Sequence, residues 1–174
     1  MPKKYNNNRL LIVTVGLPRS GKSTWAMAQG FPIVNRDSIR LALHGHRFVP
    51  EAEDMVAAIA LCMVRALFLA GHSHVVVDET CTTRKRRDWW KKSIEPTTVF
   101  KHIDTSRKVC MERAIRERDD KIVPVIARMS DQFEPLGEDE FNVDDFNVPP
   151  IAEQDADKAS ADAARTSATR KDGE

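Results

Sequence analysis

One stretch near the N-terminus constrains the fold of this chain more than any other feature. It reads Gly16-Leu-Pro-Arg-Ser-Gly-Lys-Ser-Thr24 and fits the pattern G-x-x-x-x-G-K-[ST]. The apolar, β-branched run Leu10–Val15 precedes it, and a helical segment over Ser23–Gln29 follows it. A strand, a glycine loop and a helix in this order aim backbone N–H groups at one point, where they bind phosphate. The alternative, a chance match within a glycine-containing turn, leaves both flanking patterns unexplained.

The residues of this loop have separate expected roles in binding a nucleoside triphosphate. The Lys22 ammonium would reach the β- and γ-phosphates of ATP, and the Ser23 hydroxyl would hold Mg²⁺. The residues expected to contact the nucleotide are Gly16, Pro18, Ser20, Gly21, Lys22, Ser23 and Thr24.

Short apolar runs alternate with helical patterns along residues 1–133. Strands are predicted over 10–15, 31–34, 75–78 and 97–103, and helices over 50–70, 83–93, 106–118 and 124–133. This alternation is typical of βαβ units, so we expect an α/β domain with a parallel sheet of four or five strands flanked by helices. Arg65 interrupts the apolar part of the helix over 50–70, which argues against a membrane span.

The net charge of +1 conceals a division between a basic body and an acidic end. Residues 1–133 carry 23 Lys and Arg against 14 Asp and Glu, whereas residues 134–174 carry 4 against 12. A basic body fits a polyanionic partner, and we favour a nucleic acid, DNA before RNA, over the alternative that the charge merely serves ATP. Residues 134–150 form an acidic segment that can dock on the body. Residues 151–174 cannot bury enough apolar surface to fold, so we expect a disordered acidic tail there.

The cysteines and the N-terminus indicate a compartment. Cys62, Cys81 and Cys110 are odd in number and form no C-x-x-C pair, which indicates reduced thiols. The N-terminus is polar and lacks the apolar region of a signal peptide. Both observations predict a cytoplasmic location, in the host cytoplasm if a phage encodes the chain.

A second candidate segment, Asn35-Arg-Asp-Ser-Ile-Arg40, follows the second predicted strand directly. Ligands of open parallel sheets bind beyond the carboxyl ends of the strands, so Asp37 and Arg40 should lie beside the phosphate loop. Asp37 could take the proton from an attacking hydroxyl, and Arg40 could hold a phosphate of the substrate. The alternative is that Asp37 only caps a helix that starts at Ser38.

A third candidate is Asp78, which ends the third predicted strand after three valines. An apolar strand that ends in a carboxylate is typical of the Walker B motif, whose Asp orients Mg²⁺ and its waters. The alternative is a charged residue at the point where a strand leaves the core.

Basic and aromatic residues gather in the run Arg84-Lys-Arg-Arg-Asp-Trp-Trp-Lys-Lys92. Cations at a helix start oppose the helix dipole, so their presence there indicates an anionic partner. We expect Arg86 and Arg87 to bind the substrate, and basic side chains interleaved with Trp89 and Trp90 could grip a strand of nucleic acid. The alternative is a solvated helix face with one of the two tryptophans in the core.

Arginines also precede the loop at Asp119, in the pattern helix, short polar loop and Pro-started helix that would build a lid. Lid arginines stabilise charge on the transferred phosphoryl group. Arg118 is the first candidate and Arg113 the second. The alternative is an exposed charged helix in which Glu112 pairs with Arg116.

Four segments taken together resemble the P-loop kinase domain of T-even phage polynucleotide kinase and its relatives. They are GLPRSGKSTWA, NRDSIR, VVVDET with RKRRDWW, and RERDDKIVP, and they cover residues 10 to about 133 in order. The first segment is shared by many kinases, whereas its combination with Asn-Arg-Asp-x-x-Arg is much more specific.

This resemblance implies the P-loop kinase fold over residues 1–133 and transfer of the ATP γ-phosphate to a hydroxyl of a polynucleotide. It implies Lys22 and Ser23 at the phosphates and Mg²⁺, Asp37 as general base, Arg40 at the acceptor's phosphate and Arg118 as lid arginine. Two departures put the acceptor site in doubt, and no phosphatase domain follows. Arg19 stands where the phage enzyme has a glycine, and Cys81 stands where it has an Asn.

Several rival functions stay open from the sequence. The chain is similar also to phage kinases that phosphorylate 5-hydroxymethyluracil bases in DNA. A small-molecule or toxin-type kinase of the same fold would have little use for the basic run. A nucleotide-dependent switch without transfer chemistry lacks the Asn-Lys-x-Asp guanine motif here. A purely structural nucleic-acid binder leaves an intact Lys22-Ser23 unexplained.

Overall fold

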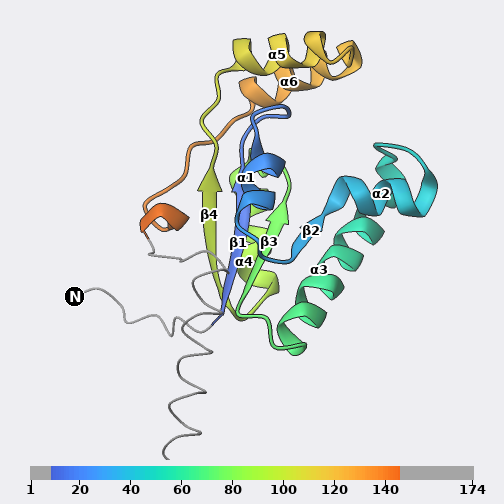
Figure 1. The fold of residues 1–174 in the computed structure, drawn as a ribbon. Helices are drawn as coiled ribbons and strands as arrows, with labels where there is room; N and C mark the ends of the chain where they lie inside the picture. The colour runs from blue at the N-terminus through green and yellow to red at the C-terminus, as the bar shows by residue number, and fades with distance from the viewer. Residues whose placement is uncertain (1–8, 146–174) are drawn as a thin grey trace, which may run out of the picture.

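Four parallel strands form the centre of the molecule, in the order β2-β3-β1-β4 (Figure 1). The structure is a computed structural model and describes residues 9–145. The strands are β1 (Leu10–Val15), β2 (Ile33–Asn35), β3 (His74–Asp78) and β4 (Thr97–His102). The predicted α/β class is confirmed, with four strands in the sheet. The tail expected over 151–174 lies outside the described residues.

Six α-helices flank this sheet in the described part of the chain. They are α1 (Lys22–Ala28), α2 (Arg36–His44), α3 (Glu53–Leu69), α4 (Arg84–Ser93), α5 (Arg107–Arg116) and α6 (Val123–Asp131). Short 3₁₀ turns lie at η1 (Pro50–Ala52), η2 (Asp120–Ile122) and η3 (Val143–Asp145). None of the helices in residues 9–145 combines the length and apolarity needed to cross a bilayer.

The alternation of side chains along β1 explains the two sides of the sheet. Leu11 and Val13 face a core cluster that contains the buried residues of α3 together with Trp90 of α4. Leu10 and Ile12 face the opposite cluster, which contains Ala26 of α1. Helices therefore cover both faces, as parallel sheets require.

Two further helices, α5 and α6, lie beyond the carboxyl ends of the strands (Figure 1). They pack on each other through a small cluster that includes Cys110, Ala114 and Ile126, and Leu17 of the phosphate loop joins the same cluster. The expected lid is thus connected to the loop by packing.

Residues 134–145, which we call the acidic strap, lie against the body next to β4. The Phe100 N–H donates to the Phe141 carbonyl at 2.8 Å, and the Lys101 ammonium donates to Asp144 at 2.6 Å. Val143 is buried in the same cluster as Ala26. The strap therefore adds apolar and charged contacts to the outer edge of the sheet.

Candidate active site

The phosphate loop takes a backbone shape that side chains oppose. Gly16 has a φ of 150°, and a Cβ there would lie 2.8 Å from the Ile103 carbonyl oxygen. Gly21 has a φ of 108° and stands at the N-cap of α1. Glycine is therefore required at both positions, and α1 begins at Lys22, one residue before the predicted start.

Lys22 is buried beneath the loop. Its ammonium donates to the Leu17 carbonyl at 2.6 Å and lies 3.4 Å from the Ser20 hydroxyl. Burial lowers the pKa of Lys22, and the charges of Asp78 and Asp37 act in the opposite direction. The main opposing charge, Asp78, comes from the end of β3, so two separate βα units meet at Lys22.

Asp78 holds the centre of a polar cluster at the ends of three strands. The Ser23 hydroxyl and the Asn35 amide donate to Asp78 Oδ2 at 2.6 and 2.8 Å, and the Thr14 hydroxyl lies 3.4 Å from Oδ1. A hydroxyl and a carboxylate are the hard oxygen donors that Mg²⁺ accepts, with water and phosphate completing its shell. Ser23 and Asp78 thus fit the expected ion. Among residues 9–145, no larger group of His, Cys, Asp and Glu gathers as a metal site.

The helix after β2 begins two residues earlier than one of the sequence alternatives predicted. Helix α2 begins at Arg36, and the Asn35 side chain caps it by accepting from the Ser38 N–H at 2.8 Å. The alternative of a helix starting at Ser38 with Asp37 as its cap is therefore wrong, because Asn35 already occupies the cap position. The Asp37 side chain is consequently free of capping and 75% exposed.

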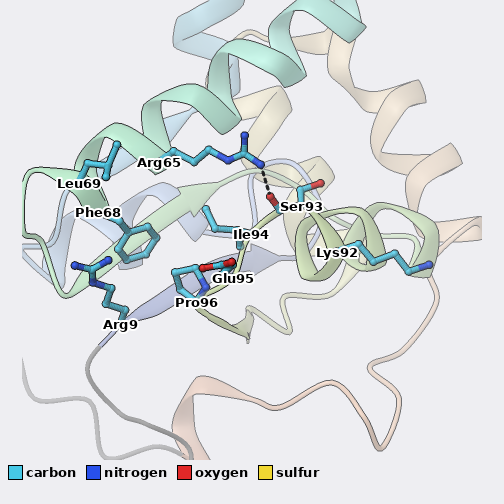
Figure 2. Close-up of a pocket in the computed structure, with 9 residues that line it drawn as sticks. All are labelled: Arg9, Arg65, Phe68, Leu69, Lys92, Ser93, Ile94, Glu95 and Pro96. Carbon is cyan, nitrogen blue, oxygen red and sulfur yellow. Dashed lines mark hydrogen bonds between the residues drawn. The ribbon is translucent and has the colours of Figure 1, made fainter.

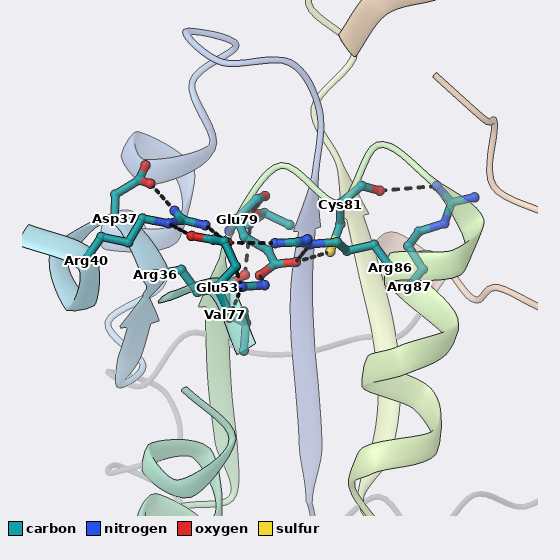
Figure 3. Close-up of polar contacts among 10 residues, drawn as sticks. Arg36, Asp37, Arg40, Glu53, Val77, Glu79, Cys81, Arg86 and Arg87 are labelled. Carbon is teal, nitrogen blue, oxygen red and sulfur yellow. Dashed lines mark hydrogen bonds and ion pairs between the residues drawn. The ribbon is translucent and has the colours of Figure 1, made fainter. Parts of the chain in front are cut away.

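Arg40 is held between two carboxylates (Figure 3). Its Nε and Nη2 donate to the two oxygens of Glu53 at 2.6 and 2.8 Å, and its Nη1 donates to Asp37 at 2.5 Å. The Glu53 hydrogen bond raises the pKa of Arg40 and lowers that of Glu53. The two-point contact with Glu53 fixes the plane of the guanidinium, so Asp37 and Arg40 face one another at the carboxyl edge.

Glu53 and Glu79 tie this pair to α4 through two more arginines (Figure 3). Arg36 donates to Glu53 at 3.1 Å and to Glu79 at 3.2 Å. Arg86 lies 3.3 Å from Glu79 and 3.8 Å from Glu53, and its side chain is 44% exposed. Burial would raise the pKa of Glu79, but the charges of Arg36 and Arg86 outweigh it and lower that pKa.

Arg87 was predicted to bind substrate, but the structure buries it inside the protein. Its side chain is fully buried, and its guanidinium makes five hydrogen bonds. Figure 3 shows the one to the Cys81 carbonyl. Two go to the Glu140 carboxylate at 2.7 and 3.0 Å, and the others go to the carbonyls of Cys81, Glu134 and Pro135. All five guanidinium donors are used inside the protein, so the expectation that Arg87 binds substrate is corrected.

The two lid candidates lie in different environments. Arg113 Nη1 donates to the Arg19 and Ser20 carbonyls of the phosphate loop at 3.0 and 3.1 Å. Arg118 is exposed, and its side chain makes no hydrogen bond or ion pair within residues 9–145. Arg113 is therefore the arginine that contacts the loop in this structure.

Both departures from the resembled family occur where the backbone is left-handed. Arg19 has a φ of 66° and Cys81 a φ of 40°, a region that glycine and asparagine adopt more readily. Arg19 pairs with Glu117 and, at 2.6 Å, with Asp119, while Arg47 reaches Asp119 at 2.7 Å. These ion pairs join the phosphate loop to the lid loop and hold Arg19 in its position.

Three residues of this site escaped sequence analysis. Asn35 and Thr14 position Asp78, and Glu53 positions Arg40. Asn35 could have been found, since it precedes Arg36 at a strand end where a cap is needed. Glu53 carried no signal beyond an acidic residue in the first turn of a helix.

Comparisons with known proteins agree with this architecture. A family model described as an AAA domain matches residues 11–136. A chain in the structure of a Pnkp1/Rnl/Hen1 complex is 25% identical with a TM-score of 0.57, over 64% of this chain and 40% of that one. A gluconokinase from Sinorhizobium meliloti 1021 is 23% identical with a TM-score of 0.55, over 79% and 82%. A sugar kinase from Janibacter sp. HTCC2649 is 22% identical with a TM-score of 0.57, over 78% and 83%.

The phosphate loop, the Asp78 cluster and these similarities define a P-loop domain with the kinase fold. The chain belongs to the AAA domain family whose model spans residues 11–136. The resemblance to P-loop kinases of the polynucleotide kinase type is confirmed at this level. The present chain spans 40% of the chain that it matches in the Pnkp1/Rnl/Hen1 complex.

Proposed function

We propose that this protein is an ATP-dependent kinase that transfers the γ-phosphate to a hydroxyl of a nucleic acid. One observation carries the proposal: Arg40 donates to Asp37 in the first turns of α2, which follows the carboxyl end of β2 directly. A carboxylate beside an arginine can receive a molecule that carries both a hydroxyl and a phosphate. The carboxylate then faces the hydroxyl and the arginine faces the phosphate. The buried free thiols Cys81 and Cys110 fit the reducing cytoplasm, where ATP is available.

The chemistry assigned to these residues is a single displacement. The acceptor oxygen forms a bond to the γ-phosphorus, the bond from that phosphorus to the β-bridging oxygen breaks, and ADP leaves. Asp37 takes the proton of the hydroxyl, Arg40 holds the acceptor's phosphate, and Lys22 with a lid arginine neutralises the phosphoryl oxygens. Mg²⁺, held by Ser23 and Asp78 when bound, would supply further positive charge at the phosphates.

Arg113 and Arg118 share the lid role in this proposal. Arg113 stays on the phosphate loop, where it contacts the Arg19 and Ser20 carbonyls. Arg118, exposed two residues after α5 ends, would reach the transferred group when the lid closes.

A small-molecule kinase is the second candidate function. The gluconokinase and the sugar kinase align over 82% and 83% of their own lengths, against 40% for the Pnkp1/Rnl/Hen1 chain. An arginine that awaits a phosphate favours the nucleic acid, because gluconate and simple sugars carry none. A related structure is titled an RNA repair complex, so the test includes RNA beside DNA.

The experiment is a labelling panel with radioactive ATP and Mg²⁺. The acceptors are DNA and RNA oligonucleotides with a 5′-hydroxyl, the same strands with blocked ends, strands with internal 5-hydroxymethyluracil, and gluconate as the small-molecule control. We expect label on oligonucleotides, and digestion then locates it at an end or a base. Label on gluconate alone would contradict the proposal, as would hydrolysis of ATP without transfer to any acceptor.

A further inference from the structure

Exposed cations without a carboxylate partner are unevenly distributed over the described residues. Eleven of the 21 arginines and lysines between 9 and 145 form ion pairs. Those exposed cations that form none fall into two groups. One group belongs to the lid and comprises Arg116, Arg118, Lys121 and Arg128. The other lies away from the lid and comprises Arg9, Arg65, Lys85 and Lys92.

Helix α4 carries two members of the second group, Lys85 and Lys92, between two flanks that neighbouring segments cover. One side of the helix faces α3, where Arg86 pairs with Glu53 and Arg65 Nη2 donates to the Ser93 carbonyl at 3.0 Å. The opposite side faces the acidic strap, where Arg84 and Lys91 each lie 2.6 Å from Asp139. Neighbouring segments therefore neutralise the cations on both flanks of the helix.

Between these flanks, three residues form an exposed crest. Lys85, Trp89 and Lys92 are spaced i, i+4 and i+7, so they share one stripe of the helix. Trp89 is 36% exposed and packs edge-on against the buried Trp90, with 4.8 Å between ring centroids. Asp88 next to the crest is engaged by Arg84 and Lys91 at 3.6 and 3.7 Å. The crest thus presents a cation, an indole and a cation with no anion of its own to bind.

Lys92, the last residue of the crest, lines a pocket that Figure 2 shows. Arg9 and Pro96 of the same pocket directly precede β1 and β4, so the pocket lies at the amino-terminal edge of the sheet. The pocket has a volume of about 520 Å³. Arg9, Arg65 and Lys92 contribute positive charge to its lining, against one carboxylate, Glu95. The apolar lining residues are Phe68, Leu69, Ile94 and Pro96. Cations around apolar side chains suit a phosphate attached to a flat, apolar ring system.

We propose that the crest of α4 and this pocket bind the strand of a single-stranded nucleic acid beyond its acceptor nucleotide. The inference rests on the proposed function and extends it to the substrate's length. Asp37, Arg40, Glu53 and Arg86 form a continuous chain of ion pairs from the acceptor site to the start of α4. Helix α4 then extends about 15 Å to the pocket, at 1.5 Å per residue. Phosphates would bind the crest lysines and a base would stack on Trp89.

The test measures binding and transfer with two acceptors of different length. A fluorescent single-stranded 12-mer with a 5′-hydroxyl would reach the crest, whereas a dinucleotide with a 5′-hydroxyl would occupy the acceptor site alone. The variants are Lys85→Glu with Lys92→Glu, and Trp89→Ala. Lys121→Glu with Arg128→Glu, two exposed cations without a carboxylate partner in the described residues, is the matched double charge reversal, and circular dichroism confirms that each variant is folded.

We expect the double reversal to weaken 12-mer binding at least tenfold and Trp89→Ala to weaken it about tenfold. The slope of log K against log salt should fall by about 0.7 for each phosphate that the variant no longer neutralises. The KM of the crest variants for the 12-mer should rise with kcat unchanged, while their KM for the dinucleotide should not change. The control double reversal should bind the 12-mer as the wild type does.

The possible failures are distinguishable. If the wild type phosphorylates oligonucleotides but the crest variants bind the 12-mer as it does, the crest proposal is overturned and the proposed function stands. If the wild type binds the 12-mer through the crest yet transfers no phosphate to it, the proposed function alone is overturned. If it neither binds nor phosphorylates any oligonucleotide, both are overturned.

Discussion

Arg40 and Arg87 are two buried arginines that the sequence presents alike, and the structure uses them in opposite ways. The Arg87 guanidinium has every donor satisfied by Glu140 and backbone carbonyls in a fully enclosed site. The Arg40 guanidinium is clamped by Glu53 on one side and meets the exposed Asp37 on the other.

The difference teaches how to separate a structural cation from a functional one. A buried arginine whose donors all bind protein acceptors has no donor left for a ligand. Replacing it should therefore change the free energy of unfolding. An arginine fixed by one carboxylate and facing a second, solvent-accessible carboxylate can exchange that partner for a substrate phosphate. Replacing such an arginine, or the carboxylates beside it, should therefore change kcat or KM.

The largest expected effect lies at the exposed partner of Arg40. Asp37→Asn should lower kcat about 10²- to 10⁴-fold, because the amide cannot accept the hydroxyl proton. Thermal stability and ATP affinity should stay close to wild type, since the side chain is 75% exposed. Turnover with labelled ATP and a binding isotherm for ATP test both statements, with Glu112→Gln as the exposed control. An Asp37→Asn enzyme of normal turnover would remove Asp37 from the mechanism.

The second effect is the reverse, a loss of stability without a loss of catalysis. Arg87→Met should lower the free energy of unfolding by about 3–5 kcal/mol, because it leaves the buried Glu140 carboxylate with only the Gly137 N–H and a longer contact to Arg84 at 3.8 Å. Adding Glu140→Leu should recover part of that loss, since the carbonyls of Glu134 and Pro135 would still lack a donor. Urea unfolding measures the change, and kcat of the folded fraction should match wild type. A stable Arg87→Met variant with impaired kcat would reverse the distinction between the two arginines.

A smaller effect is expected at the residue that clamps Arg40. Glu53→Gln removes the charge from the two-point contact, so Arg40 should lose its fixed orientation. The KM of the nucleic-acid acceptor should rise about 10- to 150-fold, in line with about 1.5–3 kcal/mol for a hydrogen bond to a charged group. The KM of ATP should not move, and Glu51→Gln, shortly before it in the chain and exposed, provides the control. Equal rises in both KM values would show general damage to the site instead of a positioning role.

The smallest effect concerns the acidic strap at low pH. Hydrogen bonds from Lys91 and Arg84 lower the pKa of Asp139 from 3.8 to about 2. Because the folded-state pKa is depressed, the stabilisation is present above about pH 4 and is lost as pH falls toward about 2. Asp139→Asn should flatten this part of the stability curve, which urea titrations between about pH 5 and pH 2 can measure. An unchanged pH profile in the variant would mean that these ion pairs contribute nothing to stability.

The sequence was sufficient to predict those elements whose structure depends on residues adjacent in the chain. The strand before Gly16, the buried run ending at Asp78 and the phosphate loop follow from residues adjacent in sequence, and they lie where the pattern predicts. The partner of Arg87 is 53 residues away, and its burial depends on how the strap folds back. The helix cap is Asn35 and not Asp37, and this could not be read from the sequence because Asn and Asp both favour the cap position. Tertiary contact with Asp78 supports the choice of Asn35.

The carboxylate that neutralises Arg87 has a consequence for synthesis on the ribosome. The whole sheet and helices α1 to α6 precede Glu140 in the chain, so they emerge before the only anion that pairs with Arg87 inside residues 9–145. Until the strap leaves the exit tunnel, that guanidinium must remain hydrated, which keeps α4 from sealing against β4. The nascent domain should therefore resist protease only after Glu140 has emerged, and a chain arrested at Phe133 should be digested although every strand is present.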